Sequence, residues 1–111
     1  MNNTAVNVNE VIALLEGDEV ALALGLVMKG YKVENNKNNI VFHFGSGSLV
    51  CGKTIDVTLR RFHSYDSTQY YAVVNIKTWS YDGDDVEIEN HFDFRCQCSK
   101  ALDKIEMVLS I

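Results

Sequence analysis

Apolar residues recur at helical spacing in two stretches near the N-terminus, which predicts two short helices. The first helix is expected to begin after Asn7, a residue type that caps helices, with Glu10 three positions later, and to end at Gly17. Asp18 is expected to cap the second helix, over residues 19–29. This second stretch is apolar almost all round, so we expect it to be largely buried.

From residue 31 the apolar residues alternate with polar ones, which predicts strands. The alternating stretches cover residues 31–34, 40–44, 54–60, 70–79 and 86–98, with turns or loops at 35–38, 45–48, 61–67 and 82–84. A last helix, capped by Ser99, carries an apolar stripe of Leu102, Ile105, Val108 and Leu109. The order ααβββββα predicts one α+β domain over residues 1–111: a five-stranded antiparallel meander sheet with two N-terminal helices and one C-terminal helix packed on one face.

The last predicted strand contains the sequence ENHFDFRCQC, which places a histidine, an aspartate and two cysteines close together. Successive strand side chains point to opposite faces of a sheet. Cys96 and Cys98 are therefore expected to face the core, whereas His91 and Asp93 point the other way. Because these groups do not surround one ion, we predict no metal site, no bound cofactor and no disulfide here.

The register of the last hairpin follows from keeping core residues opposite core residues. A three-residue connection at 82–84 achieves this by placing Val74 opposite Phe92 and Ala72 opposite Phe94. The face away from the helices is called the outer face below. Its predicted pairs are Tyr81–Asp85, Trp79–Glu87, Lys77–Glu89, Asn75–His91, Val73–Asp93 and Tyr71–Arg95.

The outer face is expected to mix aromatic residues with carboxylates. Six of the fifteen acidic residues lie between Asp82 and Asp93, with no Lys or Arg among them. Aromatic anchors rimmed by charge are typical of protein–protein interfaces, while a solvated sheet face with a few aromatic residues is the alternative. The predicted partner-binding residues are Tyr71, Lys77, Trp79, Tyr81, Asp85, Glu87, Glu89, His91 and Asp93.

Charge and composition narrow the choice of partner. The 111 residues are 47% hydrophobic and carry a net charge of −5, which disfavours direct binding to nucleic acid or anionic membranes and favours a larger, basic protein. The longest apolar run, 20–28, is too short to cross a bilayer. No signal peptide is visible at the N-terminus, so we expect a cytoplasmic location and reduced cysteines.

These features together predict a non-enzymatic interaction module. In general type it resembles small inhibitors such as the anti-restriction, anti-CRISPR and toxin-immunity proteins, some of them from phages. That resemblance implies a partner that is a nucleic-acid-binding enzyme or complex. Carboxylates at alternate strand positions repeat about every 6.7 Å, so a ladder that mimics nucleic-acid phosphates is geometrically feasible.

Two alternatives remain open at this point. The chain is a small-molecule-binding or hydrolytic domain if His91 with Asp93, the 61–67 loop, or a pocket between sheet and helices forms a site. It is a homodimer if two outer faces pack together around Val41, Val73 and Trp79. We favour a protein that is not an enzyme, because no nucleophile or second carboxylate is placed to complete the His91 and Asp93 pair.

Overall fold

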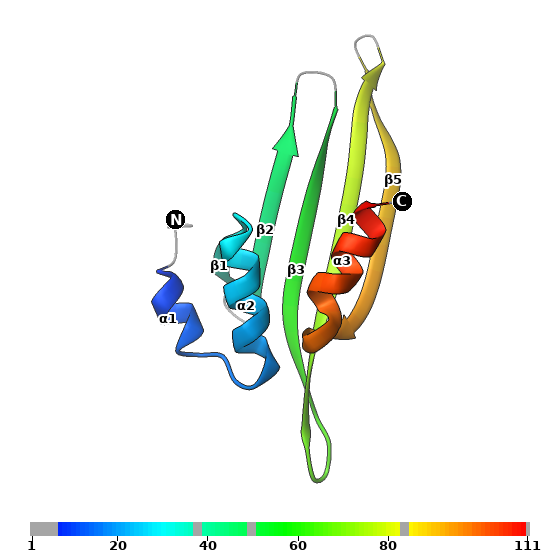
Figure 1. Ribbon diagram of the computed structural model, residues 1–111. Helices are drawn as coiled ribbons and strands as arrows, with labels where there is room; N and C mark the ends of the chain where they lie inside the picture. Colours follow the sequence, from blue (N-terminus) through cyan, green and yellow to red (C-terminus); the bar gives the residue numbers. More distant parts are fainter. Residues whose placement is uncertain (1–6, 37–38, 49–50, 83–84, 111) are drawn as a thin grey trace.

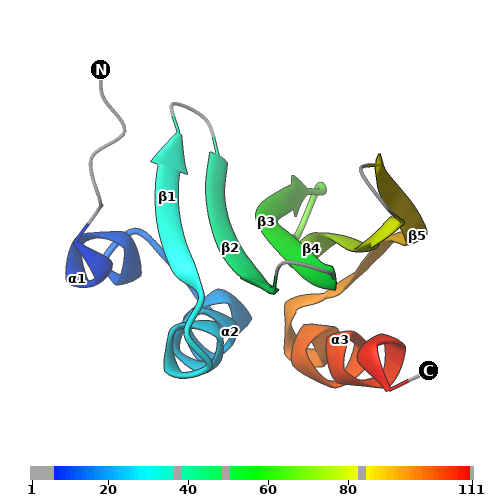
Figure 2. The same cartoon turned by 90° about the horizontal axis from the view of Figure 1, so that it is seen from above.

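The chain forms a five-stranded antiparallel sheet with helices packed against one of its faces (Figures 1 and 2). The computed structural model describes residues 7–36, 39–48, 51–82 and 85–110, with the backbone alone described for residues 36, 82 and 85–89. The elements are α1 (Val8–Ile12), α2 (Asp18–Met28), β1 (Lys32–Asn36), β2 (Asn39–Gly47), β3 (Cys51–His63), β4 (Thr68–Asp82), β5 (Asp85–Gln97), the 3₁₀-helix η1 (Cys98–Lys100) and α3 (Ala101–Leu109). The strands lie in the order β1-β2-β3-β4-β5, which confirms the predicted α+β meander.

The two faces of the sheet follow the alternation of residues along the central strands. The buried positions of β3 and β4 are Ile55, Val57, Leu59, Ala72, Val74 and Ile76. The register pairs them with one another, so they form one continuous apolar surface. Leu22 and Leu26 of α2 and Ile105 of α3 belong to the same buried core. Figure 2 shows α2 and α3 together beneath the sheet, and no described helix covers the outer face.

The helices differ from the prediction at their ends. Asn7 caps α1 as predicted, because its side-chain oxygen accepts a hydrogen bond from the N–H of Asn9 at 2.9 Å. However, α1 ends at Ile12 and not at Gly17. Gly17 instead occupies the N-cap position of α2 with a φ of 56°, so the predicted capping by Asp18 is wrong. A positive φ favours glycine, which explains why the chain turns there.

The helix α2 is buried on one side only, which corrects the prediction of a largely buried helix. Leu22, Ala23 and Leu26 face the core, whereas Leu24 and Met28 are 48% and 86% exposed. A helix that forms the outer layer of a two-layer arrangement keeps one side in water whatever residues it carries. Within the described residues, no helix is long and apolar enough to span a membrane.

Several predicted turns are shorter than expected because the strands extend into them. β1 continues to Asn36, β2 to Gly47 and β3 to His63. At the other end of the chain, Ser99 lies inside η1 and does not cap α3, whose N-cap residue is Lys100. Long strands gain backbone hydrogen bonds at each added pair, which outweighs the turn preference of glycine, serine and asparagine.

The predicted register of the last hairpin is wrong by one position near its tip and by two positions beyond a β-bulge. Asp82 pairs with Asp85, and a β-bulge beside Thr78 and Trp79 then shifts the pairing by one residue. The observed pairs are Tyr81–Val86, Ser80–Glu87, Trp79–Ile88, Lys77–His91, Asn75–Asp93, Val74–Phe94, Val73–Arg95, Ala72–Cys96 and Tyr71–Gln97. Beyond the bulge, even-numbered residues of β4 again lie opposite even-numbered residues of β5. The predicted separation of core and outer residues therefore holds there, although the partners differ.

A buried carboxylate joins α2 to the sheet. Glu19 is 2% exposed and accepts hydrogen bonds from Nε and Nη2 of Arg61 on β3 at 2.8–3.2 Å. Arg61 also donates to the carbonyl of Leu14, and Glu19 accepts from the backbone N–H of Glu16. The Tyr70 hydroxyl donates to the Glu16 carboxylate at 2.8 Å. These bonds hold the α1–α2 connection against β3 and β4.

Loss of the Arg61 guanidinium is expected to destabilise the fold because it leaves the Glu19 carboxylate buried without its partner. We expect Arg61→Met to lower the free energy of unfolding by about 3 kcal/mol, the lower end for a broken buried pair, because 33% of the Arg61 side chain is exposed. Arg60→Met is the matched control on the outer face and is expected to cost less than about 1 kcal/mol. Urea unfolding followed by circular dichroism measures both. Equal losses in the two variants would contradict this role for Arg61.

Candidate functional site

A row of polar residues crosses the outer face from one edge of the sheet to the other. The row consists of Lys32, His43, Asp56, Asn75 and Asp93, one from each strand. Nδ1 of His43 is hydrogen-bonded to Asp56, and the side-chain amide of Asn75 donates to Asp93. His91 lies beside Asp93 on β5, with 3.2 Å between its Nε2 and the Asp93 Oδ1. Each of these two histidines is therefore paired with a carboxylate.

The two histidine–aspartate pairs do not form one site. His43 lies on β2 and His91 on β5, with β3 and β4 between them. Both pairs are open to solvent, with side-chain exposures of 42–60%. Among the described residues, neither histidine is hydrogen-bonded to a hydroxyl or thiol, and no group of three or more metal-ligating side chains is found. The described geometry is that of surface hydrogen bonds that order the outer face.

Trp79 lies on the outer face as predicted, but its indole ring packs against its own sheet. Gly52 is its partner on β3, and a Cβ atom there would lie only 2.3 Å from the Trp79 ring. A Cβ atom on Gly47 of β2 would lie 3.2 Å from the same ring. The Tyr81 ring meets the indole edge-on, with 5.5 Å between ring centroids. The tryptophan thus covers two glycines, which have no side chains of their own to pack.

The remaining predicted partner-binding residues are placed as follows. Tyr71 is half-buried between Arg60 and Gln97, and Lys77, Tyr81, His91 and Asp93 are exposed. The side chains of Asp85, Glu87 and Glu89 lie outside the described residues. Their backbone register differs from the prediction, because Glu87 pairs with Ser80 and the bulge falls at Glu89. Because a bulge breaks the regular alternation of a strand, the backbone of β5 does not keep one regular series of alternate positions from Asp85 to Asp93.

The described part of the outer face carries both signs of charge. Its acidic residues include Glu34, Asp56 and Asp93, and its basic residues include Lys32, Arg60, Lys77 and Arg95. The described part of the outer face is therefore mixed in charge. Five of the six acidic residues between Asp82 and Asp93, on which the predicted acidic character rests, have side chains outside the described residues.

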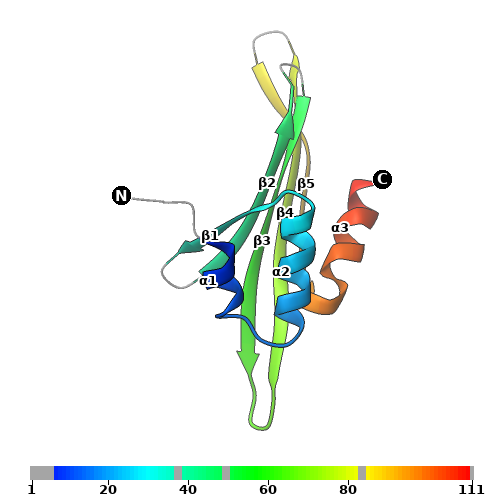
Figure 3. The same ribbon diagram turned by 60° about the vertical axis from the view of Figure 1, so that its left-hand side comes forward.

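The 61–67 segment forms the tip of the β3–β4 hairpin, which projects beyond the helices (Figures 1 and 3). His63 is hydrogen-bonded to Thr68 at 3.1 Å, and the Ser64 hydroxyl is hydrogen-bonded to Ser67 at 2.9 Å. These bonds close the turn. Among the described residues, the histidine, serine and aspartate of this segment are not hydrogen-bonded to one another. Tyr65 at the tip is fully exposed.

The three cysteines are free thiols. Cys96 packs partly buried against the core, as predicted. Cys98 is also buried, but it begins η1 and does not belong to the strand. Burial raises the pKa of the Cys98 thiol to about 12, with a smaller effect from Glu19, and burial also raises the pKa of Cys96. Both thiols therefore stay protonated and poorly nucleophilic at neutral pH, while Cys51 is exposed.

A cavity of about 310 Å³ lies on the other side of the sheet, between α2, α3 and the strands. Sequence reasoning gave only the general alternative of a pocket between sheet and helices. It could not name the lining residues, because they come from five separate elements or their flanks and converge only in the folded chain. Comparison of the chain with protein-family models, with curated proteins and with solved structures finds no match.

The packing of Trp79 over Gly52 makes this glycine sensitive to a single added methyl group. We expect Gly52→Ala to lower the free energy of unfolding by about 1–3 kcal/mol, because the new Cβ would overlap the indole ring and the Ser46 carbonyl oxygen. Gly45→Ala is the matched control, since its nearest neighbour, His43, would be at an ordinary 3.6 Å. Urea unfolding and the fluorescence of the single tryptophan report both effects. An unchanged emission spectrum in Gly52→Ala would contradict the packing described here.

Proposed function

We propose that the chain is a non-enzymatic interaction module that binds a larger protein through the outer face. The observation that carries this proposal is the one-sided covering of the sheet. The helices α2 and α3 pack on the inner face, while no described element covers the outer face of a sheet whose central strands contain thirteen and fifteen residues. A broad, ordered face without a covering layer is a surface on which a second protein can pack.

The residues of the outer face support a protein partner. Val41 and Val73 occupy one row, separated by Thr58, and all three are half-buried. Tyr71 and Arg60 lie beside this row and pair with each other. An apolar centre with tyrosine and arginine beside it and charged residues around it has the composition of a protein interface.

The partner is proposed to be basic because the whole chain carries a net charge of −5. The more specific form of the proposal is an inhibitor of the anti-restriction, anti-CRISPR or immunity type, which occupies the working surface of a nucleic-acid-binding enzyme. Small size and acidic charge support that form. The mixed charges on the described outer face would then set the orientation of the partner more than the strength of binding. The three free thiols fit the reducing conditions of the cytoplasm, which we propose as the location.

A pair of charge insertions tests which side of the sheet binds. We expect Val73→Glu, at the centre of the outer face, to weaken binding of the partner by about 2 kcal/mol or more, roughly thirtyfold. Leu24→Glu is the matched control, because Leu24 is 48% exposed on α2 on the opposite side. The partner is captured from host lysate with the unmodified chain and identified, and the purified pair is titrated by calorimetry. Thermal melts check that each variant folds.

The reverse pattern, with loss of binding only in Leu24→Glu, would move the interface to the helices and overturn the proposal. Analytical ultracentrifugation of the chain alone tests the alternative of a homodimer. A dimer that Val73→Glu dissociates would replace the larger partner with a second copy of this chain.

A further inference from the structure

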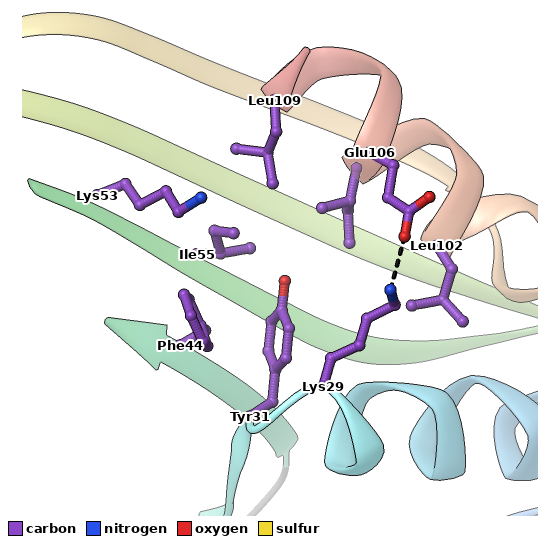
Figure 4. A pocket seen from close by; sticks show the side chains of 9 residues that line it. Lys29, Tyr31, Phe44, Lys53, Ile55, Leu102, Glu106 and Leu109 are labelled. Carbon is purple, nitrogen blue, oxygen red and sulfur yellow. Dashed lines mark hydrogen bonds and ion pairs between the residues drawn. The ribbon is translucent and has the colours of Figure 1, made fainter. Parts of the chain in front are cut away.

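The cavity beneath the sheet opens where the two long helices separate (Figure 4). Leu102 of α3 packs against Gly25 of α2 so closely that a Cβ atom on the glycine would lie 2.5 Å from it. Farther along, the ion pair between Lys29 and Glu106, 2.6 Å long, spans the gap between the helices. The cavity is lined by Lys29, Tyr31, Phe44, Lys53, Ile55, Leu102, Ile105, Glu106 and Leu109. Its volume of about 310 Å³ is at the lower end of the range for small-molecule sites.

The walls of the cavity are mostly apolar. Ile55 and Ile105 are buried core residues that form its inner surface, and the rings of Tyr31 and Phe44 are in contact, with 5.2 Å between their centroids. Leu102 and Leu109 close the side formed by α3. An apolar group that packs against these walls would remove apolar surface from water, which is the main source of affinity in such sites.

Two polar groups at the cavity lack a partner within the described part of the chain. Figure 4 shows the Tyr31 hydroxyl and the Lys53 ammonium directed into the cavity. Neither makes a hydrogen bond or ion pair with a described residue, whereas the neighbouring Lys29 is neutralised by Glu106. An ammonium group beside apolar walls binds most favourably to an anion that also has apolar surface, because that surface packs against the walls while the anion pairs with the ammonium group. Burial and the nearby Glu106 raise the pKa of Tyr31 to about 12, so its hydroxyl remains a hydrogen-bond donor at neutral pH.

We propose that this cavity binds a small carboxylate with an apolar body, such as the anion of a medium-chain fatty acid. Lys53 and the Tyr31 hydroxyl would bind the carboxylate, and the apolar walls would pack against the hydrocarbon chain of the ligand. A single negative charge matches the cavity better than a doubly charged phosphate, because Lys53 is the one lysine of the described lining that has no carboxylate partner, whereas Lys29 is paired with Glu106. The cavity lies on the side of the sheet opposite the outer face, so this inference goes beyond the proposed protein interaction and does not depend on it.

The probe for the test is octanoate, titrated into ¹⁵N-labelled full chain and followed by NMR. We expect saturable shifts at residues that line the cavity, and smaller or no shifts at outer-face residues such as Asn75. Octyltrimethylammonium and 1-octanol carry the same tail with a positive or neutral head. Both are expected to bind at least about tenfold more weakly, because neither offers a negative charge to the Lys53 ammonium. Equal binding of all three probes, or no saturable shift with octanoate, would overturn the proposal.

Two variants test the head-group contacts directly. Lys53→Met keeps the length of the side chain and is expected to weaken octanoate binding about tenfold, and Tyr31→Phe about fivefold, since each removes one donor to the anion. Lys77→Met, which removes an exposed lysine from the outer face, is the matched control and is expected to leave the affinity unchanged. Thermal melts confirm that each variant is folded. If neither Lys53→Met nor Tyr31→Phe differs from Lys77→Met, the cavity does not recognise the carboxylate.

Discussion

The recurrence of apolar residues at every second position along β3 and β4 is the constraint on which the rest of the structure depends. Their uninterrupted pairing places Ile55, Val57, Val74 and Ile76 on one face, where α2 and α3 cover them. A one-residue slip in this pair would exchange the two faces and place these side chains in water. The Glu19–Arg61 pair then fixes α2 on the covered face. Both proposals follow from this division: the uncovered face offers a surface to a protein, and the covered face contains a cavity for a small anion.

Periodicity was sufficient to predict the architecture because each strand and helix carries its own local signal. The five strands, their order and the inward orientation of Cys96 follow from it. The register of β4 and β5 could not be predicted in this way. The alternation of residues fixes which face a residue occupies, but it does not distinguish between registers that differ by two positions. A bulge beside Thr78 and Trp79 takes up one residue, and no sequence pattern marks it.

The candidate site was predictable only in part, since it depends on contacts between residues far apart in the chain. Trp79 was correctly placed on the outer face, but its packing over Gly47 and Gly52 requires the register of three strands. The buried Glu19 belongs to a helix that looks apolar, and its partner lies 42 residues away. The residues that line the cavity can likewise be identified only once the position of α3 relative to Lys53 is known. Contacts of this kind produce no periodic pattern of apolar and polar residues in the sequence.

The most direct test of the central claim, that the outer face binds a partner, is carboxyl footprinting of the purified complex. Asp56 and Asp93 lie on the outer face with side chains 44% and 60% exposed, and Asp103 is exposed on α3 at the opposite side. Carbodiimide labelling followed by mass spectrometry compares the three carboxylates in the free and bound chain. The account predicts that binding protects Asp56 and Asp93 and leaves Asp103 as reactive as before. Protection of Asp103 with unchanged labelling of Asp56 and Asp93 would contradict it.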